Sequence, residues 1–220
     1  MGGMQALDWA IRYPDMVKAC IPIASTSGLT PMALAFGAVG RHAITSDSNW
    51  KEGNYTSEKI VPKQGLSTAR MIGHITYLSE HSMHAKFGRK LQEKKDYGYD
   101  FSTDFQIESY LHHQGDKFVE NFDANSYLYL SKAMSYFDLK KKFGSLESAF
   151  SNTQCRFLIM SISSDMLYPS KLSIEMAMTL MRLNKSVSYC EIDSNFGHDG
   201  FLLETEKLSI PIQSFLGALS

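Results

Sequence analysis

The C-terminal third of the chain alternates between short apolar runs and amphipathic stretches, and this alternation limits the fold more than any other feature. Two runs typical of buried strands, residues 155–162 and 187–192, each precede a segment with helical periodicity, residues 171–184 and 205–218. Strands that are joined through a helix lie parallel, with a right-handed crossover. The sequence therefore predicts an α/β fold with a parallel sheet.

The N-terminal end shows a helix followed by a strand, which is part of the same alternating pattern. A helix is predicted over residues 3–13, ended by Pro14, and a buried strand over residues 17–25 that leads into a loop rich in Ser, Thr, Gly and Pro. From there to about residue 148 only helical periodicity recurs, at residues 66–78, 105–118 and 126–137. We therefore expect a helical insertion between two parts of one sheet.

Composition excludes several classes of protein. With 220 residues, 44% of them apolar, the chain can bury a core as one domain that carries an inserted subdomain. A balance of 22 basic and 23 acidic residues gives no surface for a phosphate backbone, so we expect no nucleic-acid partner. The longest apolar stretches are far shorter than the roughly 18 residues of a membrane span, which predicts a soluble protein without a membrane partner.

The three cysteines, Cys20, Cys155 and Cys190, are well separated and lie in apolar, strand-like surroundings. An odd number of separated cysteines in apolar surroundings is typical of reduced, buried thiols in a cytoplasmic protein.

Polar residues follow both C-terminal strands. Asp165 comes directly after the first strand and His198 after the second, and reactive groups collect where parallel strands end. An acid after one strand and a histidine after the next is the order in which an α/β-hydrolase supplies its carboxylate and its base. Taken singly, Asp165 could cap a turn, and His198 is one of seven histidines. As a pair, they favour a catalytic role.

The nucleophile of such an enzyme lies on a sharp turn of the form G-x-S-x-G. The chain opens with MGGMQAL, the right-hand half of this turn, with Met1 as the residue after the nucleophile and Gly2 as the following glycine. We therefore expect a serine directly before Met1, preceded by one residue and a glycine, and expect this chain to be a fragment that lacks its nucleophile.

Six separated blocks carry a specific resemblance. They are MGGMQAL (1–7), GLSTARMIGHITY (65–77), ESYL (108–111), FDANSY (122–127), SDMLYP (164–169) and GHDGFL (197–202). Together they resemble the homoserine O-acetyltransferase family. The resemblance implies an α/β-hydrolase core, residues 1–31 and 149–220, with a helical lid over residues 32–148 inserted after the sixth strand.

The resemblance also implies residue roles. Asp165 is the triad acid, His198 the base, Arg70 and Asp199 bind substrate, and Met1 occupies the oxyanion position after the nucleophile. Homoserine is a zwitterion, so its site independently requires a cation for the carboxylate and an anion for the ammonium group. Arg70 and Asp199 provide one of each.

The implied reaction is ping-pong acyl transfer. Serine, activated by His198, takes the acetyl group from acetyl-CoA, and the homoserine hydroxyl then removes it for methionine synthesis. Acetyl-CoA is a co-substrate, and the resemblance implies neither a bound cofactor nor a metal. Family members are cytoplasmic homodimers, and we expect the lid to form the dimer interface.

Several alternatives remain. A homoserine O-succinyltransferase or an α/β-hydrolase esterase would use the same acid and base, although an esterase for neutral lipids has no need of a zwitterion site. From another class, the chain could be an inactive fragment that acts only in dimerisation. The histidines at 81, 84, 112 and 113 lack the Cys or carboxylate partners of a zinc site, so zinc is poorly supported.

Overall fold

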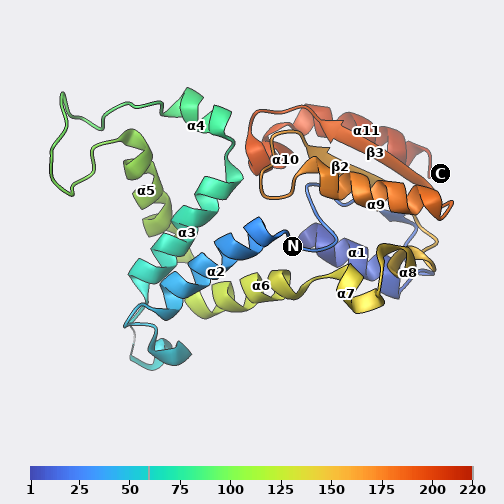
Figure 1. The fold of residues 1–220 in the computed structure, drawn as a ribbon, viewed down its shortest axis with the longest axis horizontal. Coiled ribbons are helices and arrows are strands. Elements are labelled where there is room, and N and C mark those ends of the chain that lie inside the picture. Colours follow the sequence, from blue (N-terminus) through green and yellow to red (C-terminus); the bar gives the residue numbers. More distant parts are fainter. Residues whose placement is uncertain (59, 220) are drawn as a thin grey trace.

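The computed structural model describes residues 1–58 and 60–219, in which a small parallel sheet adjoins a group of helices (Figure 1). The strands are β1 (Ala19–Cys20), β2 (Arg156–Ile162) and β3 (Val187–Ile192), and the short 3-10 helices are η1 (Lys51–Gly53), η2 (Tyr55–Glu58) and η3 (Gly197–Asp199). The α-helices are α1 (Gly2–Arg12), α2 (Pro31–Thr45), α3 (Lys63–Tyr77), α4 (Glu80–Lys86), α5 (Gln106–Asn121), α6 (Ala124–Tyr136), α7 (Leu139–Phe143), α8 (Leu146–Phe150), α9 (Ser170–Arg182), α10 (Gly200–Leu203) and α11 (Thr205–Gly217).

The described residues form a three-stranded sheet in the order β1-β2-β3, with all strands parallel. Cys20 lies opposite Phe157, and Phe157 lies opposite Val187. From Phe157 onward every residue of β2 is buried, as expected for a strand covered on both faces. The predicted parallel sheet is confirmed.

Side chains of β2 alternate between two apolar layers. Phe157 and Ile159 pack with buried residues of α1, α8 and α9, whereas Leu158 and Met160 face the layer that includes Phe215 of α11. This alternation follows the two-residue period of a strand. The sheet is thus held between helices on both faces, which fixes the ends of β2 and β3 where Asp165 and His198 lie.

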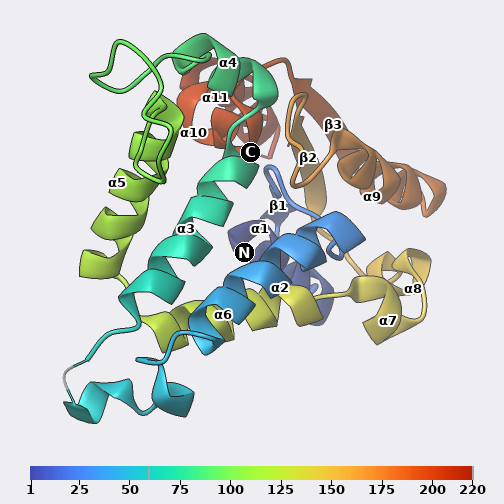
Figure 2. The same ribbon diagram turned by 60° about the vertical axis from the view of Figure 1, so that its left-hand side comes forward.

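The middle of the chain is helical. Helices α2, α3, α5 and α6 pack against one another beside the sheet (Figure 2), around a third cluster of buried side chains. Its members are Ile44, Tyr55, Leu66, Ala69 and Ala124. Between residues 29 and 153 the described residues form no strand, only isolated bridges.

Helical periodicity in the sequence does not reveal α2. Thr30 caps this helix by accepting a hydrogen bond from the Ala33 amide at 3.1 Å, and Pro31 occupies its first turn. Its sequence is apolar almost all round and contains Gly37 and Gly40, so no polar face marks it as a helix.

The prediction of a strand over residues 17–25 is wrong in length, because the strand in the structure is much shorter. Only Ala19–Cys20 forms β1, followed by a single bridge between Ile23 and Met160. Pro22 has no amide hydrogen to continue the ladder, and Ala24 has a φ of 44°, outside the strand region.

The division into core and lid remains a prediction, but its boundaries fall inside helices. The boundary after residue 31 cuts the first turn of α2, and the boundary after residue 148 cuts α8. Leu139 of α7 and Phe150 of α8 pack with α1 and α9, so these short helices belong with the sheet layer. No helix in the described part combines the length and apolarity needed to cross a bilayer.

Candidate active site

Asp165 and His198 meet at the edge of the sheet. Nδ1 of His198 lies 2.7 Å from Oδ2 of Asp165, and the side chains are 16% and 0% exposed, respectively. Asp165 follows the end of β2 and His198 lies in η3 after β3, so adjacent parallel strands deliver both groups to one place.

The Asp165 carboxylate is fixed by its own loop. Its Oδ1 atom accepts hydrogen bonds from the backbone amides of Leu167 and Tyr168, both at 2.8 Å. Because Oδ1 is held in this way, Oδ2 is directed to Nδ1 of His198. A carboxylate at Nδ1 sets the imidazole tautomer and leaves Nε2 as the proton acceptor for a nucleophile.

Aromatic rings surround the His198 imidazole. The ring centroids of Tyr168 and Phe201 lie 5.1 Å away and that of Tyr77 lies 6.0 Å away. Burial, reinforced by Tyr77 and Asp165, raises the pKa of Tyr168 to about 12. Tyr168 therefore stays neutral at physiological pH, and the His198 imidazole is bordered by three uncharged aromatic rings.

Gly197 allows the His198 loop to approach the end of α3. It has a φ of 67°, and a β-carbon at this position would lie 2.6 Å from both the Tyr77 carbonyl oxygen and the Ser79 amide nitrogen. Only glycine tolerates both the left-handed conformation and backbone contact this close. The loop also binds α4, because Ser82 donates to the Asn195 carbonyl at 2.7 Å.

Arg70 and Asp199 bring opposite charges to the same region. The Arg70 guanidinium lies over the rings of Phe118 (4.7 Å) and Tyr77 (5.7 Å). Neither Arg70 nor Asp199 makes an ion pair or a side-chain hydrogen bond with another described residue. Burial raises the pKa of the Asp199 carboxyl, and the charges of His198 and Arg70 oppose this shift. Two partly buried charges that lack an ion-pair or hydrogen-bond partner among the described side chains are complementary to a ligand that carries both signs.

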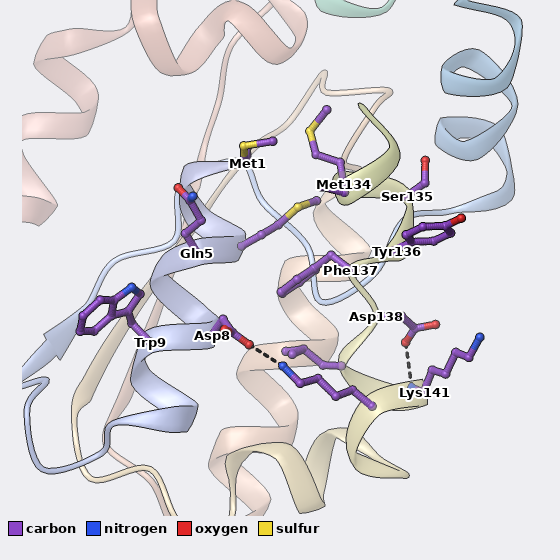
Figure 3. Close-up of a pocket in the computed structure, with 14 residues that line it drawn as sticks. Met1, Gln5, Asp8, Trp9, Met134, Ser135, Tyr136, Phe137, Asp138 and Lys141 are labelled. Carbon is purple, nitrogen blue, oxygen red and sulfur yellow. Dashed lines mark hydrogen bonds and ion pairs between the residues drawn. The ribbon is translucent and has the colours of Figure 1, made fainter. Parts of the chain in front are cut away.

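The start of α1 lines a groove of about 920 Å³ between α1 and the segment from the end of α6 to α7. Figure 3 shows Met1 and Gln5 on one wall and Met134 and Phe137 on the other. A β-carbon on Gly3 would lie 2.5 Å from Cβ of Ser25, so the first turn of α1 packs tightly on the loop after β1.

Comparison with known proteins assigns the family. A family model described as "alpha/beta hydrolase fold" matches residues 1–205. This chain belongs to the alpha/beta hydrolase fold family. In an α/β-hydrolase the acid follows one strand of the sheet and the histidine comes last in the chain, which is the order of Asp165 and His198.

Some relatives within the α/β-hydrolases carry a more specific name than that of the fold family. A curated homoserine O-acetyltransferase from Methanohalobium evestigatum is 55% identical over 216 residues, which cover 98% of this chain and 44% of that protein. The chain thus spans less than half the length of this relative.

Solved α/β-hydrolase structures agree in fold. A homoserine O-acetyltransferase from Bacillus anthracis superposes with a TM-score of 0.90 at 27% identity, covering 98% of this chain and 57% of that one. Esterase E22 superposes with a TM-score of 0.88 at 25% identity, covering 98% and 58%.

The structure adds residues that the sequence did not single out. Tyr77, Tyr168 and Phe201 pack on the His198 ring, although each lies within a block that carried the resemblance. Buried His74 is one turn from Arg70, and its Nδ1 lies 3.1 Å from the Tyr110 hydroxyl. The spacing of residues within the blocks could have pointed to His74 and Tyr77, since positions 70, 74 and 77 share one face of a helix.

Among the described residues, the histidines at 81, 84, 112 and 113 do not gather with other ligand types into a candidate metal site. Within residues 1–58 and 60–219 there is no group of three His, Cys, Asp or Glu side chains that could hold a metal ion. His81 belongs to α4, and His112 and His113 are exposed on α5.

Proposed function

We propose that this chain supplies the acid, the base and the acceptor site of a homoserine O-acetyltransferase, which moves an acetyl group from acetyl-CoA to the hydroxyl of L-homoserine. The observation that carries the proposal is the pair of unpartnered charges, Arg70 and Asp199, beside the Asp165–His198 dyad. The 55% identity to the Methanohalobium enzyme supports it.

In this proposal Arg70 and Asp199 orient the acceptor. The planar guanidinium of Arg70 takes the homoserine carboxylate in a bidentate contact, and the Asp199 carboxylate takes the ammonium group. Asp199 directly follows His198, so binding of the ammonium group places the acceptor next to the base. Holding the hydroxyl near Nε2 favours homoserine over water as the second substrate.

The first half-reaction forms an acyl-enzyme. The nucleophile is a serine on a segment that precedes Met1, at the start of α1. His198 Nε2 takes the hydroxyl proton while the serine oxygen bonds to the thioester carbon. The carbon–sulfur bond then breaks, and CoA leaves as a thiol with the proton from His198. The Asp165 carboxylate stabilises the imidazolium in between.

The second half-reaction regenerates the serine. His198 takes the proton of the homoserine hydroxyl, whose oxygen attacks the acyl carbon, and the serine oxygen leaves with that proton. In both halves the backbone amide at position 1 donates to the developing oxyanion. No metal or bound cofactor takes part in the proposed steps.

The proposed assembly is a cytoplasmic homodimer joined through the helical insertion. Several large apolar side chains are exposed on α2 and α6, among them Leu34 (37%), Val39 (56%) and Tyr129 (79%). Exposed apolar side chains on two helices that pack against each other favour association with a second copy.

The test measures CoA release by the full-length protein that carries this chain, with and without L-homoserine. The proposal expects homoserine-dependent release that is lost in His198→Ala. An esterase, the activity named for E22, would instead hydrolyse acetyl esters at a rate that homoserine does not change. That outcome would overturn the acyltransferase assignment and retain the dyad.

A further inference from the structure

A small, partly open cavity of about 90 Å³ is lined by residues of α2, α3, α6 and the loops after β1 and β2. Two of its lining residues, Tyr77 and Tyr168, are the same rings that pack on His198. At its other end, Met134 and Ser135 line both this cavity and the groove that contains Met1. The cavity therefore lies between the surroundings of the base and those of the residue at the start of α1.

The cavity wall carries no charged side chain among the described residues. Its aliphatic hydroxyls are turned to helix carbonyls: Thr76 donates to Gly73 at 2.8 Å, Ser131 to Leu128 at 3.1 Å and Ser135 to Ser131 at 3.0 Å. Arg41 lies behind this wall, where its Nη1 donates to the Ser135 hydroxyl at 3.2 Å, and it does not line the cavity.

Tyr77 separates this neutral space from the charged acceptor region. Arg70, His74 and Tyr77 follow one another at helical spacing on the face of α3 where Arg70 meets Phe118 of α5. Gly73 and Thr76 lie on the neighbouring face, toward α2 and α6, and line the cavity. Tyr77 thus borders both the neutral cavity and the Arg70 region, and its ring centroid lies 6.0 Å from that of His198.

We propose that the neutral cavity holds the acyl group of the donor, and that its size and lack of charge select a short, uncharged acyl chain. This inference rests on the proposed function, whose two half-reactions need separate places for the acceptor head group and the acyl chain. A pocket for a drug-sized ligand measures roughly 300–1,000 Å³, so only a few heavy atoms fit here and the rest of CoA stays outside. The free carboxylate of a succinyl group would be buried without a partner.

Met134 and Gly73 set the length limit. Met134 lines both the cavity and the larger groove, so we expect its truncation to join the two spaces. Gly73 has no side chain, and a β-carbon there would meet the Tyr77 ring at 3.4–3.5 Å, an ordinary contact that takes space without a clash. Met134→Ala should therefore allow longer acyl groups to bind, and Gly73→Ala should exclude longer acyl groups more strongly than the wild type does.

The experiment compares kcat/KM of the full-length protein for acetyl-, propionyl-, butyryl- and succinyl-CoA with saturating L-homoserine. Because each added methylene in a tight pocket changes the rate by about 10- to 200-fold, we expect butyryl- and succinyl-CoA to fall at least about 100-fold below acetyl-CoA. Met134→Ala should raise the butyryl-to-acetyl ratio by about 10-fold or more. Leu130→Ala, an exposed apolar position of α6 that does not line the cavity, should leave the ratio unchanged.

Hydrolysis of p-nitrophenyl acetate, propionate and butyrate without homoserine separates this inference from the proposed function. If these esters show the length limit and the Met134 effect but homoserine accepts no acyl group, the function is wrong and the cavity assignment stands. If homoserine is acylated but succinyl-CoA equals acetyl-CoA, the cavity assignment is overturned. The cavity assignment is also overturned if neither Met134→Ala nor Gly73→Ala changes the ratios of kcat/KM for the longer acyl donors to that for the acetyl donor. Should Met134→Ala fail to fold, Gly73→Ala decides by lowering the propionyl-to-acetyl ratio.

Discussion

Gly197 lies so close to the backbone of Tyr77 that a β-carbon on it would come within 2.6 Å of the Tyr77 carbonyl oxygen. This contact joins the loop that carries His198 to the end of the helix that carries Arg70. His198 and the proposed acceptor residue Arg70 are therefore parts of one packed unit, although they are far apart in sequence. Movement of α3 would displace both together.

Gly197→Ala should damage both stability and catalysis. The left-handed conformation costs a residue with a β-carbon about 1–3 kcal/mol, and the two backbone atoms at 2.6 Å cannot move aside without shifting α3. We expect a lower Tm and a loss of kcat of about 100-fold or more. Gly217→Ala is the matched control, because an added β-carbon there meets nothing within 4 Å. Equal effects of the two substitutions would contradict the importance of the contact.

Asp165→Asn should abolish most of the activity and leave the fold intact. An amide in place of Oδ2 presents the wrong group to Nδ1 and disfavours the tautomer that needs Nε2 as acceptor. Loss of the carboxylate that orients a catalytic histidine lowers kcat by about 1,000- to 10,000-fold. Circular dichroism checks the fold, and Asp193→Asn, an exposed carboxyl in the loop before His198, serves as the control. Near-normal turnover in Asp165→Asn would remove Asp165 from the proposed dyad.

The sheet and the dyad could be predicted because each depends on local pattern. Strand-like runs followed by Asp165 and His198 predict both the parallel sheet and the contact between these two side chains. Position after a strand is enough to bring two residues together when the strands are neighbours and parallel. The predicted strand over residues 187–192 accordingly has the same bounds as β3.

Contacts between the helical part and the loops could not be predicted from periodicity. The length of β1 depends on Pro22 and on the conformation of Ala24, and α2 has no polar face to reveal it. Tyr77 and Tyr168 reach the base from elements far apart in the chain, so only the packed structure shows that they also bound the small cavity. Tertiary packing, rather than local preference, determines these features.

Arg70→Lys should impair acceptor use selectively. Lysine keeps the positive charge but cannot make a planar bidentate contact with a carboxylate, nor stack on Phe118 as guanidinium does. We expect the KM for L-homoserine to rise about 10-fold or more, which corresponds to about 1.4 kcal/mol. The burst of p-nitrophenol from p-nitrophenyl acetate should stay unchanged, because acyl-enzyme formation does not involve Arg70.

Asp199→Asn tests the other half of the acceptor site in the same assays. It should weaken homoserine binding through the ammonium group, and because this substitution lies next to His198, the acetate burst again serves as the internal control. Unchanged homoserine kinetics in both variants would remove the zwitterion site from the proposal.

His74 should make folding stability depend on pH. Burial, with the positive charges of Arg70 and Lys86, lowers the pKa of His74 from 6.5 to about 4 in the folded protein. The unfolded chain therefore binds a proton at higher pH than the folded one, and the stabilisation by neutral His74 is present above pH 6.5. It is lost as the pH falls from 6.5 through about 4. We expect this group to account for a loss of about 2 kcal/mol in the free energy of unfolding over that interval.

Urea unfolding of wild type and His74→Gln at pH 7.0 and 4.5 measures the effect of His74. Glutamine does not titrate, so the variant should lose less stability than wild type between the two pH values, even if it is less stable at pH 7.0 because it loses the contact with Tyr110. His81→Gln, an exposed histidine of α4, should follow the wild-type pH dependence. If His74→Gln and wild type lose the same free energy on acidification, His74 is not held neutral in the folded state. The low pKa attributed to its burial beside Arg70 and Lys86 would then be wrong.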